Sequence, residues 1–134
     1  MAGCSFWAPQ TFTDSRGQLV LADLSAVPFP VERIFFICEV PAHQTRGNHA
    51  LRNSVELLLT VNGSVIVTLD DGKKTKEVLL GHRDVGLIIG PNVWRVLSHF
   101  SAGAILAILA SHSYDKANQI DSYSEFLALV TGNI

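Results

Sequence analysis

Residues 45–63 read TRGNHALRNSVELLLTVNG, a stretch that combines a cluster of polar residues with a strong turn signal. Its second half, residues 54–61, is a short apolar run with β-branched residues, and another apolar run, residues 64–69, follows directly after Asn62-Gly63. Asn-Gly between two such runs is a strong hairpin signal, because a type I′ turn needs positive φ at both central residues. The sequence therefore predicts a β-hairpin over residues 54–69.

The first half of the same stretch carries polar groups close together. Arg46 and His49 lie on either side of Gly47, which lets the backbone bend, and Glu56 belongs to the apolar run that follows. If the sheet curls, these three side chains can be brought to one concavity. We expect them to form the centre of a functional site.

Short strands separated by turn residues are predicted on both sides of this stretch. Turn chemistry at 14–17 (DSRG), 70–73 (DDGK) and 90–92 (GPN) divides the chain. Residues 31–40 (VERIFFICEV) form an apolar run typical of a strand buried on both faces. Many short strands without a helical period predict an all-β jelly-roll sandwich or barrel. The expected strands are 6–13, 18–23, 31–40, 75–80, 84–89, 93–99 and 104–110.

The end of the chain breaks the strand pattern. In residues 121–130 (DSYSEFLALV) the apolar positions recur at spacings of three and four, Asp121 can cap, and Glu125 falls in the early turns. The sequence predicts one short C-terminal helix on the outside of the sheets.

The composition fits one domain, residues 1–134, part of whose surface is buried against another chain or domain. Charged residues make up 16%, well below the usual quarter of a water-exposed chain, whereas 48% apolar content is ordinary. We interpret this as a homodimer that hides an apolar sheet face or edge. The alternative is a face that packs against another domain or subunit.

Charge and cysteine usage exclude several classes of protein. The net charge of −2 comes with no basic stripe, so nucleic-acid binding is not expected. Cys4 and Cys38 have no C-x-x-C spacing and are expected to be free thiols in a reducing cytosol. No long apolar run and no basic leader occur, so a cytoplasmic protein without membrane contact is expected.

The segment RGNHALR resembles the R-G-x-H-A-H-K/R signature of the sugar 3,4-ketoisomerases, small cupin proteins that act on dTDP-4-oxo-6-deoxyglucose. The resemblance extends through FTDSRGQL, RIFFI, VNGSVIVTLDDG, GPNVWR and LASHSYDKANQIDSYSEFL. It implies a cupin-type jelly-roll barrel with one short C-terminal helix and a dTDP-linked sugar as ligand. Leu51 stands where the family has its second histidine, and Phe35 and Phe36 stand where it usually has tyrosine.

No metal and no cofactor are expected. Many cupins bind a metal through two histidines one residue apart, a glutamate and a further histidine, but here only His49 and Glu56 fit, and Leu51 takes the second place. Residues 91–96 (PNVWRV) also lack the last histidine. Two ligands are too few for zinc or iron. The resemblance implies the same, since these isomerases work without a metal.

The resemblance gives His49 the role of catalytic base. The family reaction moves a carbonyl from C4 to C3 of the hexose through an enediol, and histidine suits the proton transfer at neutral pH. The alternative is a strand histidine that merely satisfies a hydrogen bond, and we favour the functional role. Arg46 has two open roles, namely charge for a phosphate or oxyanion, and a structural salt bridge with Glu56.

Further candidates for ligand binding follow from the later motifs. Trp94 and Arg95 come after the Gly-Pro turn near the expected mouth of the barrel, and Trp94 would flank a sugar or thymine ring or else pack in the core. Tyr114 matches a family position near the rim of the site, where it would orient ligand or serve packing. The other histidines, His43, His82, His99 and His112, are expected at the surface or as satisfied core residues.

Two functions remain open. The first, which we favour, is an isomerase whose turnover is slow because the second histidine is missing, so that the proton returns through water or another residue. The second is a catalytically inactive nucleotide-sugar-binding cupin that serves as a partner or regulatory subunit, for which Leu51 and Phe36 argue.

Overall fold

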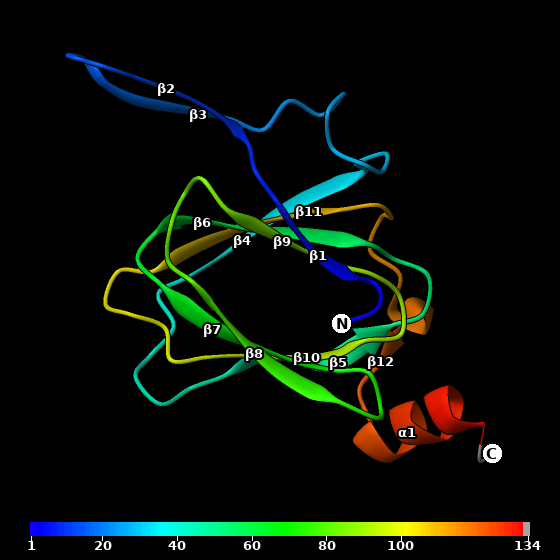
Figure 1. The fold of residues 1–134 in the computed structure, drawn as a ribbon. Coiled ribbons are helices and arrows are strands. Elements are labelled where there is room, and N and C mark those ends of the chain that lie inside the picture. Colours follow the sequence, from blue (N-terminus) through cyan, green and yellow to red (C-terminus); the bar gives the residue numbers. More distant parts are fainter. Residues whose placement is uncertain (133–134) are drawn as a thin grey trace.

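Two five-stranded antiparallel sheets face each other and enclose the barrel (Figure 1). The computed structural model describes residues 1–132, and within them no helix has the length and apolar content needed to span a membrane. One sheet has the order β1 (Cys4–Trp7), β9 (Gly86–Ile89), β6 (Glu56–Asn62), β11 (Ile105–Ala110), β4 (Arg33–Cys38). The other has the order β12 (Gln119–Ile120), β5 (Arg46–Leu51), β10 (Trp94–Ser98), β7 (Val65–Asp70), β8 (Thr75–Leu80). The predicted all-β class with one short C-terminal helix is confirmed.

The core lies between the two sheets, where alternate residues of each strand point inward. On β7, Val65, Val67 and Leu69 are almost fully buried and the residues between them are not. This alternation follows from the two-residue period of a strand. The inward side chains form one apolar cluster, which consists of Leu58, Val65, Val67, Leu69, Val78, Leu80, Leu87, Ile89, Val93, Leu97, Leu106 and Ile108.

The predicted hairpin over residues 54–69 is wrong, because β6 and β7 belong to different sheets. The Asn62-Gly63 turn instead carries the chain from one sheet to the other, and only Gly63 of the pair has positive φ, at 71°. The turn is tightly packed, since a Cβ on Gly63 would lie 2.4 Å from Ser101 Oγ. Strand β6 is buried along most of its length and pairs with β9 and β11, so it has no free edge for β7.

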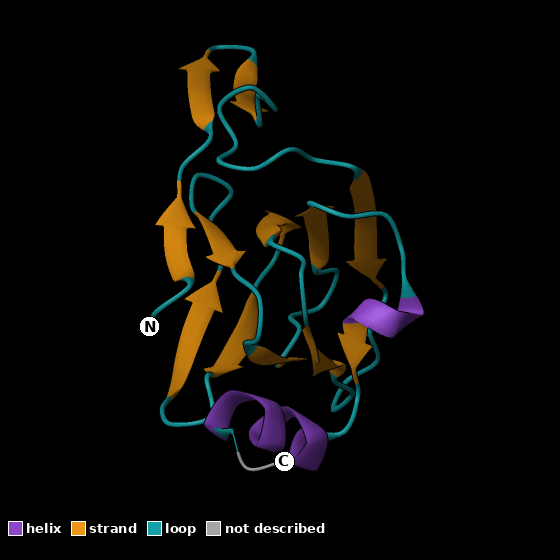
Figure 2. Ribbon diagram, turned by 90° about the vertical axis from the view of Figure 1, so that its right-hand side faces the viewer, coloured by secondary structure: helices purple, strands orange, loops and turns teal. Residues whose placement is uncertain are grey.

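The predicted N-terminal strand over residues 6–13 is split in two. Strand β1 pairs with β9 in the barrel, whereas β2 (Gln10–Asp14) pairs with β3 (Gly17–Leu21). Pro9 lies between β1 and β2 and has no N–H to continue a ladder. The β2–β3 hairpin, whose turn was predicted, extends away from the barrel (Figures 1 and 2).

The sequence predicted a strand buried on both faces over residues 31–40, but strand β4 is buried on one face only. It lies at the edge of its sheet and pairs only with β11. Phe35 and Ile37 pack against the core, whereas Ile34 and Phe36 point outward and are 52% and 65% exposed. The continuous apolar run therefore belongs to a strand with one face in the core. Its other face is exposed in the part of the chain that the structure describes.

The C-terminal helix α1 (Tyr123–Thr131) covers the part of the second sheet formed by β12, β5 and β10 (Figure 1). Its N-cap is Ser122, one residue after the predicted Asp121, and the Ser122 side chain accepts a hydrogen bond from the Glu125 backbone N–H. Phe126 is fully buried, and its ring centroid lies 5.7 Å from that of Trp94. The packing of Phe126 is therefore the main contact that fixes the helix.

Truncation of Phe126 tests this account of the helix. Phe126→Ala should lower the free energy of unfolding by about 3–5 kcal/mol, since it removes a fully buried ring. The matched control is Leu129→Ala, because Leu129 lies on the same helix but is 39% exposed, and it should cost much less. Urea denaturation followed by circular dichroism measures both variants, and equal losses would contradict the packing described.

Candidate active site

A cavity of about 480 Å³ opens between β4, β5 and β6 at one side of the barrel. The structure brings Arg46, His49 and Glu56 onto its wall, as expected from the sequence, and places Tyr114 there as well. The other four histidines lie outside this cavity. The complete wall consists of Arg33, Phe35, Thr45, Arg46, Gly47, Asn48, His49, Leu51, Glu56, Tyr114 and Gln119.

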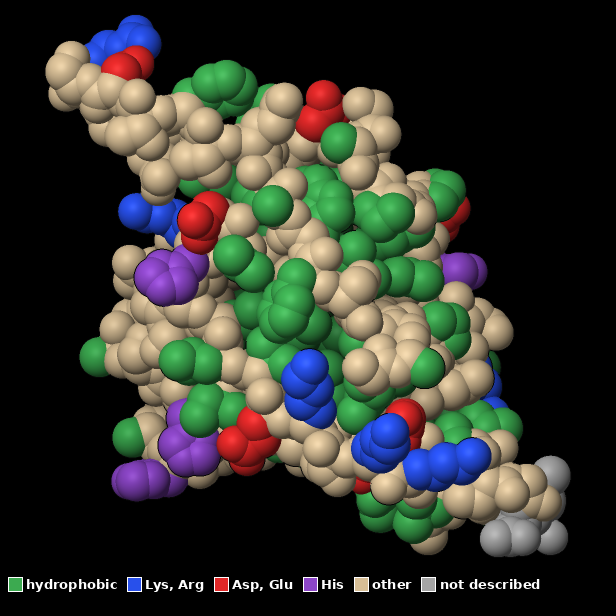
Figure 3. Space-filling view, in the orientation of Figure 1, with side chains coloured by type: hydrophobic (Ala, Val, Ile, Leu, Met, Phe, Trp, Pro, Cys, Tyr) green, Lys and Arg blue, Asp and Glu red, His purple; other side chains and the backbone are tan. Residues whose placement is uncertain are grey.

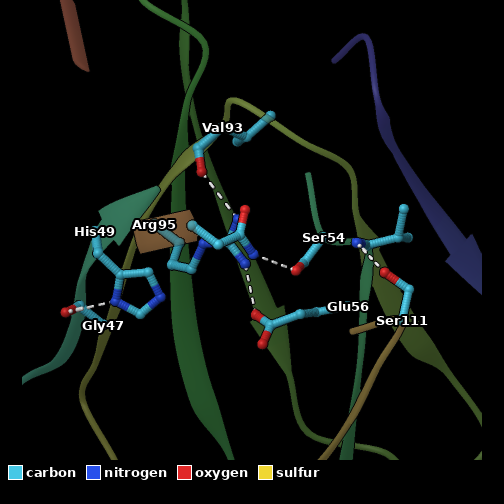
Figure 4. Close-up of polar contacts among 9 residues, drawn as sticks. Gly47, His49, Ser54, Glu56, Val93, Arg95 and Ser111 are labelled. Atoms are coloured by element: carbon cyan, nitrogen blue, oxygen red, sulfur yellow. Dashed lines mark hydrogen bonds and ion pairs between the residues drawn. The ribbon is translucent and has the colours of Figure 1, made fainter. Parts of the chain in front are cut away.

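His49 is oriented by its own strand. Its Nδ1 lies 3.1 Å from the carbonyl oxygen of Gly47, so a proton on Nδ1 donates to that oxygen and Nε2 is left as the basic nitrogen (Figure 4). Burial lowers the pKa of His49, and the positive charge of Arg95 lowers it further. The lowered pKa favours the neutral imidazole, which is the form that can accept a proton.

Gly47 makes this arrangement possible. It has φ of 84°, and a Cβ there would lie 3.0 Å from the backbone oxygen of Arg95. The register between β10 and β5 shifts between Arg95 and Val96, which marks a bulge at the same place. A glycine is required where β5 approaches β10 this closely.

Glu56, on the cavity wall, forms a buried ion pair with Arg95, which was a candidate for ligand binding but does not itself line the cavity. Arg95 Nη1 donates to Glu56 Oε1 at 2.7 Å, and Arg95 Nη2 donates to the Val93 carbonyl oxygen at 3.0 Å (Figure 4). The side chains are only 2% and 5% exposed. Burial lowers the pKa of Arg95, and the neighbouring carboxylate opposes that effect. The alternative in which Arg46 pairs with Glu56 is therefore wrong, and Arg95 acts on the cavity through Glu56.

The two departures from the family motif lie in different places. Leu51 is buried on the cavity wall, on the same face of β5 as His49, because residues two apart in a strand share a face. Phe35 also lines the cavity, whereas Phe36 points to the outer face of its sheet. Only Phe35 therefore stands where a tyrosine hydroxyl would reach the site.

Trp94 lies outside the cavity. It is adjacent to Arg95 in β10 and so points to the opposite face of the sheet, where its ring packs against Tyr123 and Phe126 of α1. The packing role that we left open from the sequence is the one that the structure shows. Tyr114, by contrast, is 70% exposed and lies at the rim of the cavity.

Arg33, Thr45, Asn48 and Gln119 also line the cavity, although they were not predicted from the sequence. The signal for Arg33 was available, because it lies two residues before Phe35 and shares its face of β4. Asn48 has φ of 57° and donates a hydrogen bond to Thr45 Oγ1 at 3.1 Å, which shapes the start of β5. Gln119 reaches the wall because β12 pairs with β5 opposite Leu51, a contact that spacing alone does not reveal.

The cavity combines one neutral base with an excess of positive charge. Glu56, its one carboxylate, is paired with Arg95, while Arg33 and Arg46 contribute two further guanidinium groups. Within residues 1–132, no three side chains of the types that bind metals gather at one point. The arrangement suits an anionic ligand from which His49 removes a proton.

The chain closely resembles proteins of known activity. It is 37% identical over 114 residues to the TDP-4-oxo-6-deoxy-alpha-D-glucose-3,4-oxoisomerase of Aneurinibacillus thermoaerophilus, over 84% of this chain and 82% of that protein. QdtA, a sugar 3,4-ketoisomerase from Thermoanaerobacterium thermosaccharolyticum solved in complex with TDP, is 29% identical and superposes with a TM-score of 0.96, over 100% of this chain and 98% of that chain. WlaRB, a TDP-quinovose 3,4-ketoisomerase from Campylobacter jejuni, is 37% identical with a TM-score of 0.89, over 95% and 98% of the two chains.

These similarities confirm the cupin-type fold predicted from the sequence. Residues 2–131 match the family described as FdtA: WxcM-like, C-terminal. The match covers nearly the whole chain and includes every residue of the cavity wall. The protein therefore belongs to the FdtA family of sugar 3,4-ketoisomerases, as its RGNHALR motif indicated.

Proposed function

We propose that this protein is an isomerase that converts a TDP-linked 4-oxo-6-deoxyhexose to its 3-oxo isomer. The observation that carries the proposal is His49, a neutral base with its tautomer fixed, on the wall of a cavity that also holds two uncompensated arginines. The relatives support it, since their activities are 3,4-isomerisations of TDP-sugars.

The reaction needs only proton transfers. His49 Nε2 takes the proton from C3, and the electron pair of that C–H bond forms the C3–C4 double bond of an enediolate whose negative charge lies on the former carbonyl oxygen. A proton then returns to C4, the hydroxyl at C3 gives up its proton to become the carbonyl, and the oxygen at C4 becomes a hydroxyl. Composition and oxidation state of the sugar as a whole are unchanged, so the proposal requires no redox cofactor.

The proposal also uses no metal. A metal beside His49 would need further ligands on the cavity wall, but Leu51 offers no donor and Glu56 is engaged by Arg95. This donor set does not fit zinc or iron, which take three or four protein ligands.

We place the reaction in the cytoplasm. Cys4 and Cys38 are both free thiols in the structure, which fits a reducing compartment. Cys4 is half-buried and Cys38 is exposed, so an oxidising environment would leave at least one thiol open to modification.

We propose further that the protein is a homodimer. Ile34 and Phe36 expose an apolar strip along β4, and Phe12 and Leu19 do the same on the projecting hairpin. Hydrophobic side chains gather over the middle of the barrel face, while charged groups lie over its lower part and at the tip of the hairpin (Figure 3), where Arg16 and Asp14 pair. A second copy of the chain would cover both apolar strips.

The first prediction of this proposal concerns pH. His49 must be neutral to take the C3 proton, and its pKa in the folded protein is lowered by burial. The value of kcat/KM should therefore stay high below the ordinary histidine pKa of about 6.5 and fall only as the pH drops through a lower value. A pH–rate profile with an acid limb at or above 6.5 would contradict the role of His49, as would an active His49→Ala variant.

The second prediction concerns the missing proton donor. Leu51→His combined with Phe35→Tyr should raise turnover by about a hundredfold, because each substitution returns a proton-carrying group to the cavity wall. The matched control is Phe36→Tyr, which adds the same hydroxyl on the outer face and should change nothing. Exchange of the C3 proton in heavy water, followed by proton NMR, measures the first step directly. Tight binding of the sugar nucleotide without exchange in any variant would favour the inactive binding protein instead.

The third prediction concerns the dimer. Light scattering should give about twice the chain mass of 14.6 kDa at micromolar concentration, and the buried area should exceed about 1,000 Å². Phe36→Lys should shift the protein to a monomer, since it puts a charge into the covered strip. Leu79→Lys is the control, because Leu79, at 69% exposed, is similar to Phe36 at 65% but lies on β8 of the other sheet. A wild-type monomer would refute the assembly.

A further inference from the structure

A polar side chain lies beside Leu51 on the cavity wall. Strand β12 pairs with β5 so that Gln119 is opposite Leu51 and Ile120 is opposite Ala50. Ala50 and Ile120 pack in one apolar cluster with Phe126 of α1, whereas Leu51 and Gln119 both line the cavity. Directly opposed residues of an antiparallel pair have Cβ atoms about 4.5–5.5 Å apart. Gln119 is therefore the cross-strand neighbour of the residue that stands in place of the motif's second histidine.

The Gln119 amide has a fixed orientation. Its Nε2 donates a hydrogen bond to Asp121 Oδ1 at 2.7 Å. An ionised carboxylate only accepts hydrogen bonds, so the nitrogen of the amide must face Asp121 and the oxygen cannot. Within residues 1–132 this is the one hydrogen bond of the Gln119 side chain. The second N–H of Nε2 and the acceptor Oε1 are therefore available to a ligand.

The amide is directed toward the catalytic base. The β12–β5 ladder ends at Ile120, and the next residue in the same register, Asp121, falls opposite His49. The pKa of His49 also indicates that Asp121 is close. Burial is the main cause that lowers this pKa, and the negative charge of Asp121 is among the causes that raise it. Because Nε2 is bonded to Asp121, the Gln119 amide extends from the level of Leu51 toward that of His49.

Asn118 fixes β12 against the corner between β5 and β6. Its carbonyl oxygen accepts from the Arg52 backbone N–H at 2.8 Å, and its Oδ1 accepts from the Asn53 backbone N–H at 2.7 Å. Its Nδ2 donates to Ser54 Oγ, and the Asn118 side chain is buried. The strand that carries Gln119 is thus tied to the corner that follows the strand of His49.

The enediolate of the proposed reaction presents two different oxygens side by side. The oxygen at C4 carries the negative charge, and the oxygen at C3 still carries a hydrogen. A primary amide offers an N–H donor to the first oxygen and a carbonyl acceptor to the second. The bond to the C4 oxygen strengthens as charge develops there, so it lowers the barrier. Leu51 offers neither group.

We propose that Gln119 is a catalytic residue that binds the C4 oxygen through Nε2–H and the C3 hydroxyl through Oε1. The assignment rests on the proposed function, because it requires the enediolate as the intermediate. An amide neither gains nor loses a proton near neutral pH, so Gln119 stabilises the enediolate and leaves the proton transfers to His49 and water. Its role therefore differs from that of a second histidine, which could transfer a proton itself.

Steady-state kinetics with TDP-4-oxo-6-deoxyglucose test the assignment. Gln119→Met keeps the length of the side chain but removes both polar groups, and it should lower kcat by about a hundredfold. Its affinity for TDP, which has no sugar, should be unchanged in a calorimetric titration. Gln119→Glu keeps the shape and an acceptor but has no N–H, and it should lose at least as much kcat. Gln44→Met is the matched control, because Gln44 is exposed and lies outside this wall, and its kcat should equal that of the wild type.

Asp121→Ala tests the orientation of the amide separately. Asp121 does not line the cavity, so this variant keeps the wall intact and removes only the acceptor that directs Nε2. It should lower kcat by less than Gln119→Met does. A kcat equal to that of the wild type would refute the orienting role of Asp121.

The outcomes separate the two proposals. Wild-type kcat in folded Gln119→Met or Gln119→Glu would overturn the role of Gln119 while leaving the proposed function standing. A loss of TDP affinity as large as the loss of kcat would overturn it too, because it would place the amide at the nucleotide. A wild-type protein that exchanges no C3 proton in heavy water would refute the proposed function itself. Thermal melting identifies any loss that comes from unfolding, and Gln119→Glu, the closest in shape, then provides the decisive kinetics.

Discussion

The ion pair between Arg95 on β10 and Glu56 on β6 joins the two sheets across the interior of the barrel. At 2.7 Å and almost fully buried, it is a contact in which the loss of either partner would leave a bare charge in the core, at a cost of about 3–5 kcal/mol. The pair also sets the charge of the cavity. Because Arg95 neutralises Glu56, the positive charge of the wall comes from Arg33 and Arg46.

The backbone of Arg95 also helps to position His49. Arg95 and His49 are opposite each other in the β10–β5 ladder, and a bulge follows directly after Arg95. Gly47 fits against the Arg95 carbonyl, and its own carbonyl then lies within reach of His49 Nδ1. The same strand contact thus fixes the tautomer of His49 and brings the positive charge that helps keep it neutral.

Features that depend on neighbouring residues along the chain could be predicted from the sequence. Apolar runs bounded by turn residues located most strands to within two or three positions, and the spacing of apolar residues located α1 with a cap one residue away from Ser122. Arg46 and His49 share one strand, so their common site followed from the motif. The predicted pairing of β6 with β7 was wrong, because an Asn-Gly turn reverses the chain whether the next strand joins the same sheet or the opposite one.

The two-residue period of a strand was enough to predict that His49 shares a face with Leu51. The same period separates Trp94 from Arg95, although the sequence analysis assigned both of them to ligand binding. It did not determine which face is inside, because that depends on the opposite sheet and on α1, which covers Trp94. Only the tertiary structure chose Arg95 as the partner of Glu56 and brought Arg33 to the cavity from β4. These contacts join residues far apart in the chain, and no local pattern records them.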